Sequence, residues 1–180
     1  MRAFVSVEGG GPAPAVDAPA VPPAPTHLTL EFLGDLPEAR VPAIVSALRA
    51  VGPRVPPFSI TLEGVGAFPS RASPRVVWLG VTEGRVELSA LAREVAAALE
   101  ALGIPRPREP FVPHLTLFRV RSAADRERAR QWLDGAREPP APRTVPVVEF
   151  RLKESTLAPS GPVHRTVEQF PLGALASGSC

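Results

Sequence analysis

The sequence has a single cysteine, Cys180, at its end. This excludes an internal disulfide framework and fits a reducing compartment, so we expect a cytoplasmic protein. No apolar run approaches the roughly 18 residues that a membrane-spanning helix needs. The first ten residues also lack the apolar region of a signal peptide. We therefore expect no association with membranes.

Metal-binding and phosphate-loop motifs are also missing. There are only three histidines, and no Cys-x-x-Cys, His-x-His or His-Glu-x-x-His spacing occurs. The glycines at positions 9–11 are followed by Pro-Ala-Pro-Ala, not by the Lys-Ser/Thr of a nucleotide-binding loop. We therefore expect neither a metal nor a cofactor.

Tyrosine is absent and lysine almost so, because 19 of the 20 basic residues are arginine. Arginine binds phosphate bidentately, which would suit an RNA or nucleotide ligand, but genome composition explains the bias equally well. With no tyrosine, stacking on a base has to come from phenylalanine or tryptophan. Trp78 and Trp132 are predicted to pack in or against the core.

The 180 residues, 44% of them apolar, are enough for one domain with its own core. Alternation of apolar residues predicts strands at residues 2–7, 27–33, 58–65, 75–81, 112–120, 145–153 and 163–170. Helical spacing and capping residues predict three helices, in residues 35–52, 83–102 and 122–133. Short strands mixed with helices indicate an α+β fold with antiparallel sheets. Residues 9–25, rich in glycine, proline and alanine, are predicted to be an irregular connection, and residues 174–180 a flexible tail.

A repeated tetrapeptide is the most informative feature. His-Leu-Thr-Leu occurs at residues 27–30 and again at 114–117, so that two of the three histidines begin the same sequence. Both copies lie in predicted strands, where side chains alternate between faces. We therefore expect His27 and Thr29 to share one face, His114 and Thr116 to share another, and the leucines to point into the core.

Two such strands around one cleft would suit acid–base chemistry at phosphorus. A neutral imidazole can take a proton from water and an imidazolium can give one to a leaving oxygen. Two imidazoles on opposite sides of a phosphate could perform both transfers, and the threonine hydroxyls could bind its oxygens. A single histidine in an apolar strand is usually structural, but the matched pair favours catalysis.

With these motifs the sequence resembles the two-histidine phosphoesterases, and within them the RNA 2′,3′-cyclic phosphodiesterases once named 2′-5′ RNA ligases. The resemblance rests on the paired His-x-Thr-x motif and extends to the segments HLTLEFLGDL, FPSRASPRVVWLGV, PFVPHLTLFRV and LKESTLAPSGPVHRTVEQFPL. It implies a single bilobal domain over residues 1–173, with one motif strand per lobe facing a central cleft and helices packed outside.

The resemblance also implies hydrolysis of an RNA or nucleotide 2′,3′-cyclic phosphate to a 2′-phosphomonoester. His27 would be the proton donor, His114 the proton acceptor, and Thr29 and Thr116 the phosphate ligands. The same groups could join RNA through a 2′-5′ linkage. Apart from the resemblance, nothing in the sequence shows which of the two histidines is the proton donor and which the proton acceptor. We expect RNA ends or nucleotides as partners and no protein partner, hence a monomer.

Several positions depart from the family pattern. Residues 9–25 are too rich in proline for the helix that relatives have there, and Glu31 stands where relatives often have a basic residue. Strict alternation puts Glu31 beside His27 and Thr29, where it would repel phosphate and raise the pKa of an imidazole, or it points to solvent. These departures leave an alternative hypothesis, an RNA- or nucleotide-binding module without catalysis.

Two further residues are candidates for ligand contacts. His164 stands where relatives often have tyrosine and could stack on a base, although an exposed surface histidine is the favoured interpretation. Arg119 follows the second motif closely and could contact phosphate, but strict alternation places it on the face opposite His114. The sequence leaves both questions open.

Overall fold

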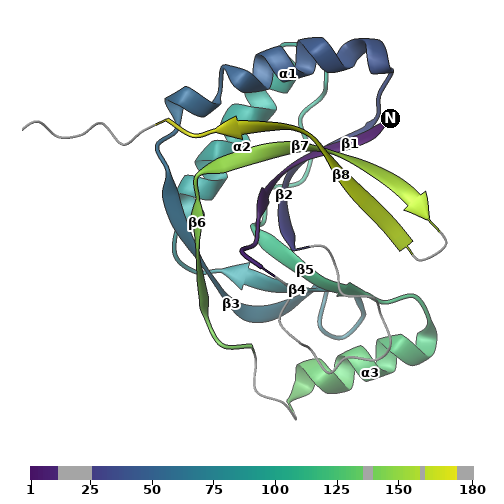
Figure 1. The fold of residues 1–180 in the computed structure, drawn as a ribbon. Helices are drawn as coiled ribbons and strands as arrows, with labels where there is room; N and C mark the ends of the chain where they lie inside the picture. Colours follow the sequence, from purple (N-terminus) through teal and green to yellow (C-terminus); the bar gives the residue numbers. More distant parts are fainter. Residues whose placement is uncertain (12–25, 136–139, 159–160, 174–180) are drawn as a thin grey trace, which may run out of the picture.

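The protein is described from a computed structural model, which covers residues 1–11, 26–135, 140–158 and 161–173. Its strands form two antiparallel four-stranded sheets, so the predicted α+β class is confirmed (Figure 1). The first sheet has the order β2 (His27–Asp35), β1 (Arg2–Glu8), β7 (Glu149–Ala158), β8 (Gly161–Pro171). The second has the order β5 (His114–Arg119), β4 (Pro74–Val81), β3 (Phe58–Pro69), β6 (Arg143–Val147).

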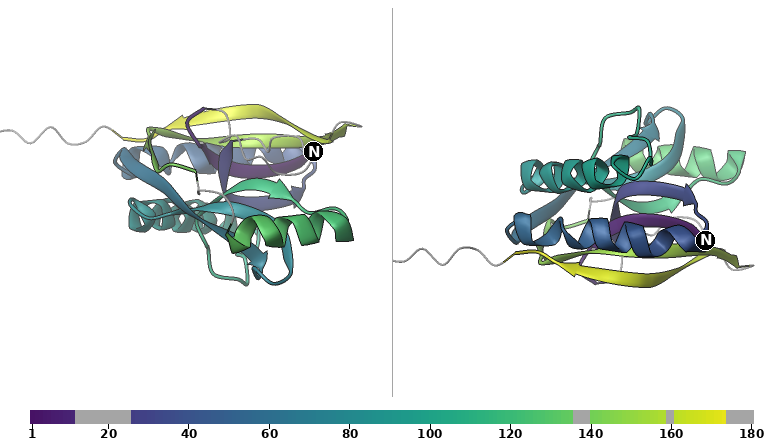
Figure 2. Two further views of the ribbon diagram at one scale, coloured as in Figure 1. Left: turned by 90° about the horizontal axis from the view of Figure 1, so that it is seen from below. Right: turned by 90° about the horizontal axis from the view of Figure 1, so that it is seen from above.

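Helices pack at the two ends of the molecule (Figures 1 and 2). α1 (Val41–Arg49) and α2 (Arg85–Glu100) contact each other and lie against the first sheet, whereas α3 (Ala123–Asp134) packs on β4. Short 3-10 turns, η1 (Glu38–Arg40) and η2 (Gly52–Arg54), flank α1. In the described residues, none of the helices combines the length and hydropathy of a transmembrane segment.

Each helix forms where the sequence has an apolar stripe or a capping residue. α2 buries one face, made by Leu88, Leu91, Ala92, Val95 and Leu99. The Ser122 side chain accepts a hydrogen bond from the Asp125 backbone N–H and so caps α3, as its sequence predicts. Pro42 lies in the first turn of α1, where a proline removes no helical hydrogen bond.

The predicted strand at residues 145–153 is wrong as a single element. It divides at Val148, which is 55% exposed, and its two parts, β6 and β7, join different sheets. The chain changes sheets at this residue, and the Val148 carbonyl accepts from the Leu172 N–H. Continuous alternation through 145–153 hides this change, because both parts have the same period. Most of the predicted connection 9–25 and all of the predicted tail 174–180 lie outside the described residues.

A β-bulge interrupts each motif strand at the same place. In β2 the partner of Val5 is Glu31 and the partner of Ser6 is Thr29, so Leu30 is an extra residue. In β5 the partners of Val77 and Trp78 are Phe118 and Thr116, so Leu117 is the extra residue. A bulge shifts the alternation by one position. Residues after the bulge therefore lie on the faces opposite to those that strict alternation predicts.

Candidate active site

The first motif lies on an edge strand, and its polar side chains face away from the core. Leu28 and Leu30 are buried, as predicted, while His27 and Thr29 are partly accessible. The imidazole of His27 packs against the ring of Phe4 in the neighbouring β1, with centroids 4.9 Å apart. We call the side of the first sheet that carries His27 and Thr29 its site face.

The second motif repeats this arrangement on the edge of the second sheet. Leu115 and Leu117 are buried, and His114 and Thr116 are partly accessible. The His114 ring makes an edge contact with Phe68, with centroids 5.0 Å apart, and Trp78 is 6.1 Å away on the other side. Trp78 is half-buried, as predicted, and in addition forms part of the surroundings of His114.

Hydrogen bonding distinguishes the two motif imidazoles. His114 Nδ1 lies 2.8 Å from the Val112 carbonyl oxygen. A carbonyl only accepts, so Nδ1 carries the proton and Nε2 is the basic nitrogen of the neutral ring. His27 Nδ1 is buried and has no hydrogen-bond partner within the described part of the chain. A hydrogen bond therefore orients the His114 ring, whereas only ring contacts hold that of His27.

β2 and β5 bring the two motifs to one seam. β2 is an edge strand of the first sheet and β5 of the second, and the two strands contact each other where the sheets meet (Figure 1). The bulge at Leu117 places Arg119 on the same face as His114 and Thr116, opposite Val76 of β4. The Arg119 charge lowers the pKa of both His27 and His114. The expectation from strict alternation is thus wrong for Arg119, which lies beside both imidazoles.

His164 also belongs to this site, and its interpretation as an exposed surface histidine is wrong. β8 places its ring in edge contact with His27 and Phe4, with centroids 5.0 Å and 4.9 Å away. His164 Nδ1, His27 Nδ1 and Ser6 Oγ are buried atoms without hydrogen-bond partners among the described residues. Buried polar groups normally have partners, so these three atoms are open to hydrogen bonds from water or from a polar ligand.

Lys153 is a site residue that sequence reasoning missed. It is the only lysine in the chain and is 8% exposed on the site face, in β7 opposite Phe4. Its ammonium group pairs with Glu8, which Arg151 also contacts at 3.4 Å. The rarity of lysine in an arginine-rich chain was an available signal. The ammonium group of lysine is smaller than the guanidinium group of arginine, so it fits in a confined space where a guanidinium group would not.

The site keeps its imidazoles neutral. Burial is the main reason that the pKa of His27 falls to about 3, and repulsion from the His164 imidazole when protonated, from Lys153 and from Arg119 adds to it. Burial lowers the pKa of His164 as well. Burial also lowers the pKa of His114, and the hydrogen bond to Val112 opposes this effect. Near pH 7 both motif histidines are therefore uncharged without substrate.

Glu31 does not lie beside His27 and Thr29. The bulge at Leu30 turns its side chain to the opposite face of the first sheet, next to α2, and leaves Phe32 on the site face. Glu31 is 6% exposed, so it does not point to solvent either, and burial raises its pKa to about 7. Both sequence-based interpretations of Glu31 are wrong for the same reason, since neither includes a bulge.

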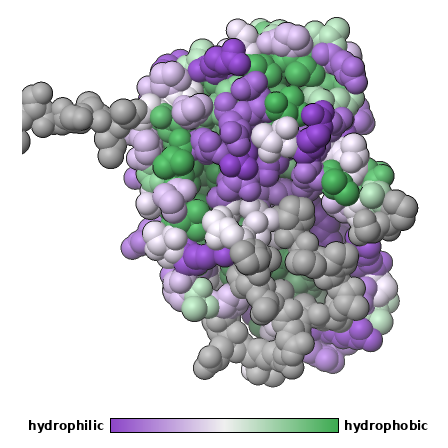
Figure 3. Space-filling model, viewed as in Figure 1, coloured by the Kyte–Doolittle hydropathy of each residue, from purple (hydrophilic) through white to green (hydrophobic). Residues whose placement is uncertain are grey.

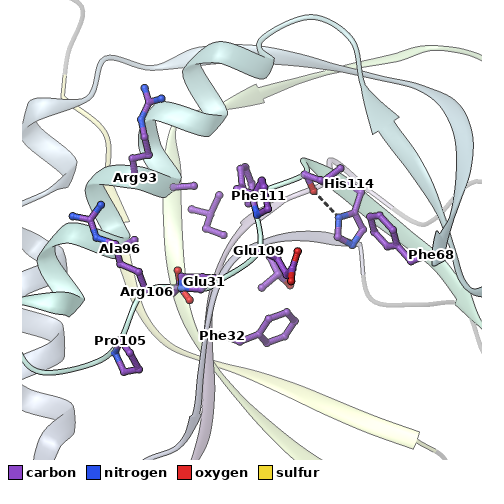
Figure 4. A pocket seen from close by; sticks show the side chains of 16 residues that line it. Glu31, Phe32, Phe68, Arg93, Ala96, Pro105, Arg106, Glu109, Phe111 and His114 are labelled. Atoms are coloured by element: carbon purple, nitrogen blue, oxygen red, sulfur yellow. Dashed lines mark hydrogen bonds between the residues drawn. The ribbon is translucent and has the colours of Figure 1, made fainter. Parts of the chain in front are cut away.

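A pocket of about 740 Å³ opens at the seam (Figure 4). His114, Thr29 and Phe68 line one side, and residues 30–32 of β2, the segment 105–112 and α2 form the rest of its wall. On the face drawn in Figure 3, hydrophilic side chains gather over β7 and β8. No group of three potential metal ligands from histidine, cysteine, aspartate or glutamate occurs within the described residues.

Sequence comparison identifies the relatives of this chain. A family model described as the 2′-5′ RNA ligase superfamily matches residues 12–156. A protein of Aquifex aeolicus named RNA 2′,3′-cyclic phosphodiesterase is 38% identical over 162 residues, which cover 85% of this chain and 81% of the relative. One of the same name from Archaeoglobus fulgidus is 39% identical over 153 residues, covering 84% and 82%.

Solved structures also resemble the fold of this chain. A crystal structure from Thermus thermophilus superimposes with a TM-score of 0.67 at 29% identity, covering 97% of this chain and 99% of that one. The structure of E. coli LigT in apo form superimposes with a TM-score of 0.68 at 25% identity, covering 96% and 98%. Another LigT structure, at 26% identity and a TM-score of 0.65, is a complex with 3′-AMP. The paired motifs, the two sheets and these matches lead to one conclusion: the chain belongs to the 2′-5′ RNA ligase superfamily of two-histidine phosphoesterases.

Proposed function

We propose that this protein hydrolyses the 2′,3′-cyclic phosphate of RNA ends or nucleotides to a 2′-phosphomonoester, without a metal. The observation that carries the proposal is the pair of imidazole–hydroxyl strands at one seam, both beside Arg119. The relatives named RNA 2′,3′-cyclic phosphodiesterase support the same reaction.

In the proposed reaction His114 is the general base. Its Nε2 takes a proton from a water molecule, and the water oxygen forms a bond to phosphorus. The Val112 carbonyl supports this role, because it holds the other ring proton and stabilises the imidazolium that forms. The bond from phosphorus to the 3′ oxygen breaks on the opposite side, and the 2′ ester bond remains.

His27 is the proposed general acid, which protonates the departing 3′ oxygen. Its low pKa means that it has to gain this proton together with the substrate. An anionic phosphate beside an imidazole raises the pKa of that imidazole. The negative charge of the bound substrate therefore favours the protonated form of His27, which the free site disfavours. The resulting product carries a 3′-hydroxyl and a 2′-phosphate.

Thr29, Thr116 and Arg119 are the proposed phosphate ligands. Neither threonine hydroxyl has a hydrogen-bond partner within the described residues, so both are available to a phosphate oxygen. Arg119 and Lys153 add positive charge where the transition state gains negative charge. If a ribose 5′-hydroxyl replaces water as the nucleophile, the same proton transfers produce a 2′-5′ linkage.

The direct test is hydrolysis of 2′,3′-cyclic nucleotides with a chelator present, followed by ³¹P NMR of the product. We expect a 2′-phosphate and a rate unchanged by the chelator. A 3′-phosphate product would contradict the assigned leaving group, and strong inhibition by the chelator would contradict the metal-free mechanism. Saturable binding without turnover, on both mononucleotides and RNA with a cyclic phosphate end, would favour the binding module.

The two kinetic parameters are expected to differ in their pH dependence. Both motif histidines have lowered pKa values without substrate, so the bell-shaped profile of kcat/KM should centre below pH 6.5. The bound phosphate raises both pKa values, so the profile of kcat should centre at higher pH. Rates measured between about pH 4 and pH 9 check this order.

Glu31 titrates in the same range and needs a control. Its pKa of about 7 could add a limb to either profile. The variant Glu31→Gln removes that group and should leave both histidine limbs in place. Profiles that are flat between about pH 5 and pH 9 in the parent and in the variant would contradict the acid–base pair.

A further inference from the structure

The pocket at the seam reaches from His114 and Thr29 around the edge of β2. Thr29 is one of its lining residues. His114 lies on its catalytic side, whereas Glu31 and Arg106 lie on the side next to α2, with Phe111 between (Figure 4). Its volume of about 740 Å³ is much larger than a phosphate group requires and is in the range of pockets that hold drug-sized ligands. The cavity therefore has space for the nucleoside to which the phosphate is attached.

Glu31 is the buried polar group of this pocket. It is 6% exposed, and its carboxylate accepts a backbone hydrogen bond from Phe32. No basic side chain forms an ion pair with it in the part of the chain that the structure describes. A carboxylate buried without its full set of donors is unfavourable. Its free lone pairs would be satisfied by a ligand that brings N–H groups.

The other charged groups around the pocket are exposed at its mouth. Arg93 projects from α2, and Arg106 and Glu109 belong to the segment before β5. Arg106 is already paired with Glu100, 2.7 Å away. The walls near Glu31 are apolar, made by Ala92, Ala96, Phe111 and the prolines 105, 107 and 110. An apolar pocket with one buried acceptor group suits a flat heterocycle that carries adjacent donors.

We propose that this pocket binds the base of the nucleotide that carries the cyclic phosphate, and that Glu31 selects guanine. This inference rests on the proposed function, because His114 and Thr29 fix where the phosphate lies. Guanine offers two adjacent donors, N1–H and the N2 amino group, on its Watson–Crick edge, and one carboxylate can accept both. Adenine and cytosine present an acceptor next to an amino group, and uracil has one N–H between two carbonyls, so none matches an acceptor pair.

Phenylalanines near the pocket would provide the stacking that proteins use for splayed-out bases. Phe111 is half-buried in the wall, and Phe32, 68% exposed, lies at the entrance on the site face. The bulge at Leu30 is what produces this arrangement. It sends Glu31 into the pocket and Phe32 to the site face, whereas without it the two side chains would exchange faces.

The test compares kcat/KM for the four 2′,3′-cyclic mononucleotides. The parent protein is expected to prefer the guanine substrate by about 5-fold to 150-fold, the range that a bidentate base contact gives. Glu31→Gln should remove this preference and favour adenine, because an amide has one donor and one acceptor. The matched control Glu87→Gln, at an exposed position of α2 outside the pocket, should retain the parent's preference.

The outcomes separate the two proposals. Equal kcat/KM for all four substrates, or a guanine preference that persists in Glu31→Gln, would overturn the base-selecting role and leave the hydrolase intact. Absence of turnover on every substrate would overturn the proposed function instead. In that case calorimetry with 2′-GMP and 2′-AMP still tests the pocket. We expect the parent protein to bind 2′-GMP more tightly than 2′-AMP, and Glu31→Gln to lose this difference. Equal binding of the two nucleotides by the parent protein would refute the proposed selection of guanine.

Discussion

Replacing His114 with alanine is expected to lower kcat for cyclic phosphate hydrolysis by about 10²-fold to 10⁴-fold, the contribution of one well-placed proton transfer. His27→Ala should cause a loss of the same order, because each imidazole serves one side of the phosphorus. Neither ring is needed to hold the strands, whose buried contacts come from the neighbouring leucines. Nucleotide binding, measured by calorimetry, should therefore persist in both variants.

Because His27 and His114 act in one displacement, their effects should not be additive. The double variant is expected to be little slower than either single variant, as is found for residues that act as a unit. His164→Ala provides the comparison, since His164 contacts the His27 ring but lies outside the two His-Leu-Thr-Leu tetrapeptides. It should lose less activity than either motif variant. If His27→Ala and His114→Ala hydrolyse the substrate normally, the two-histidine mechanism is wrong.

Leu28→Ala is expected to destabilise the protein by about 2–5 kcal/mol, the usual cost of removing a fully buried leucine side chain. Leu28 is 0% exposed on the core side of β2, so alanine leaves a cavity. Leu115 has the same environment in β5, and Leu115→Ala should cost a similar amount. Urea unfolding with unchanged m-values measures both differences.

Leu157→Ala is the matched control for these two variants. Leu157 lies in β7 and is 83% exposed, so the same chemical change should alter the free energy of unfolding by no more than about 0.5 kcal/mol. If all three variants were equally stable, the leucines of the repeated tetrapeptides would not be in the core. The faces assigned to His27 and His114 would then be wrong as well.

Sequence alternation was sufficient for the parts of the site before each bulge. His27, Thr29, His114 and Thr116 all lie on the expected faces because only one leucine separates each pair. Beyond the bulge, alternation gives the wrong answer, and this explains the errors for Glu31 and Arg119. Nothing in the tetrapeptide marks the bulge, since it depends on how neighbouring strands pair.

The remaining parts of the site depend on contacts between distant segments. His164 reaches His27 because β8 pairs with β7, β7 with β1, and β1 with β2. Lys153 enters the site through the same order of strands. A sequence read along one strand at a time contains no information on that order. The fold class could be predicted from local patterns, but the division of residues 145–153 between two sheets could not.

The position of the motif strands also affects how the chain behaves when it is partly unfolded. β2 and β5 are both outer strands, and no strand of the described residues continues either sheet beyond them. Outer strands have unpaired backbone groups on one side, which can pair with other molecules and start aggregation. In the native protein the two edges shield each other at the seam. Any change that separates the sheets would therefore expose two unpaired strand edges at once. Ligands that bind across the seam and hold the sheets together should therefore suppress aggregation.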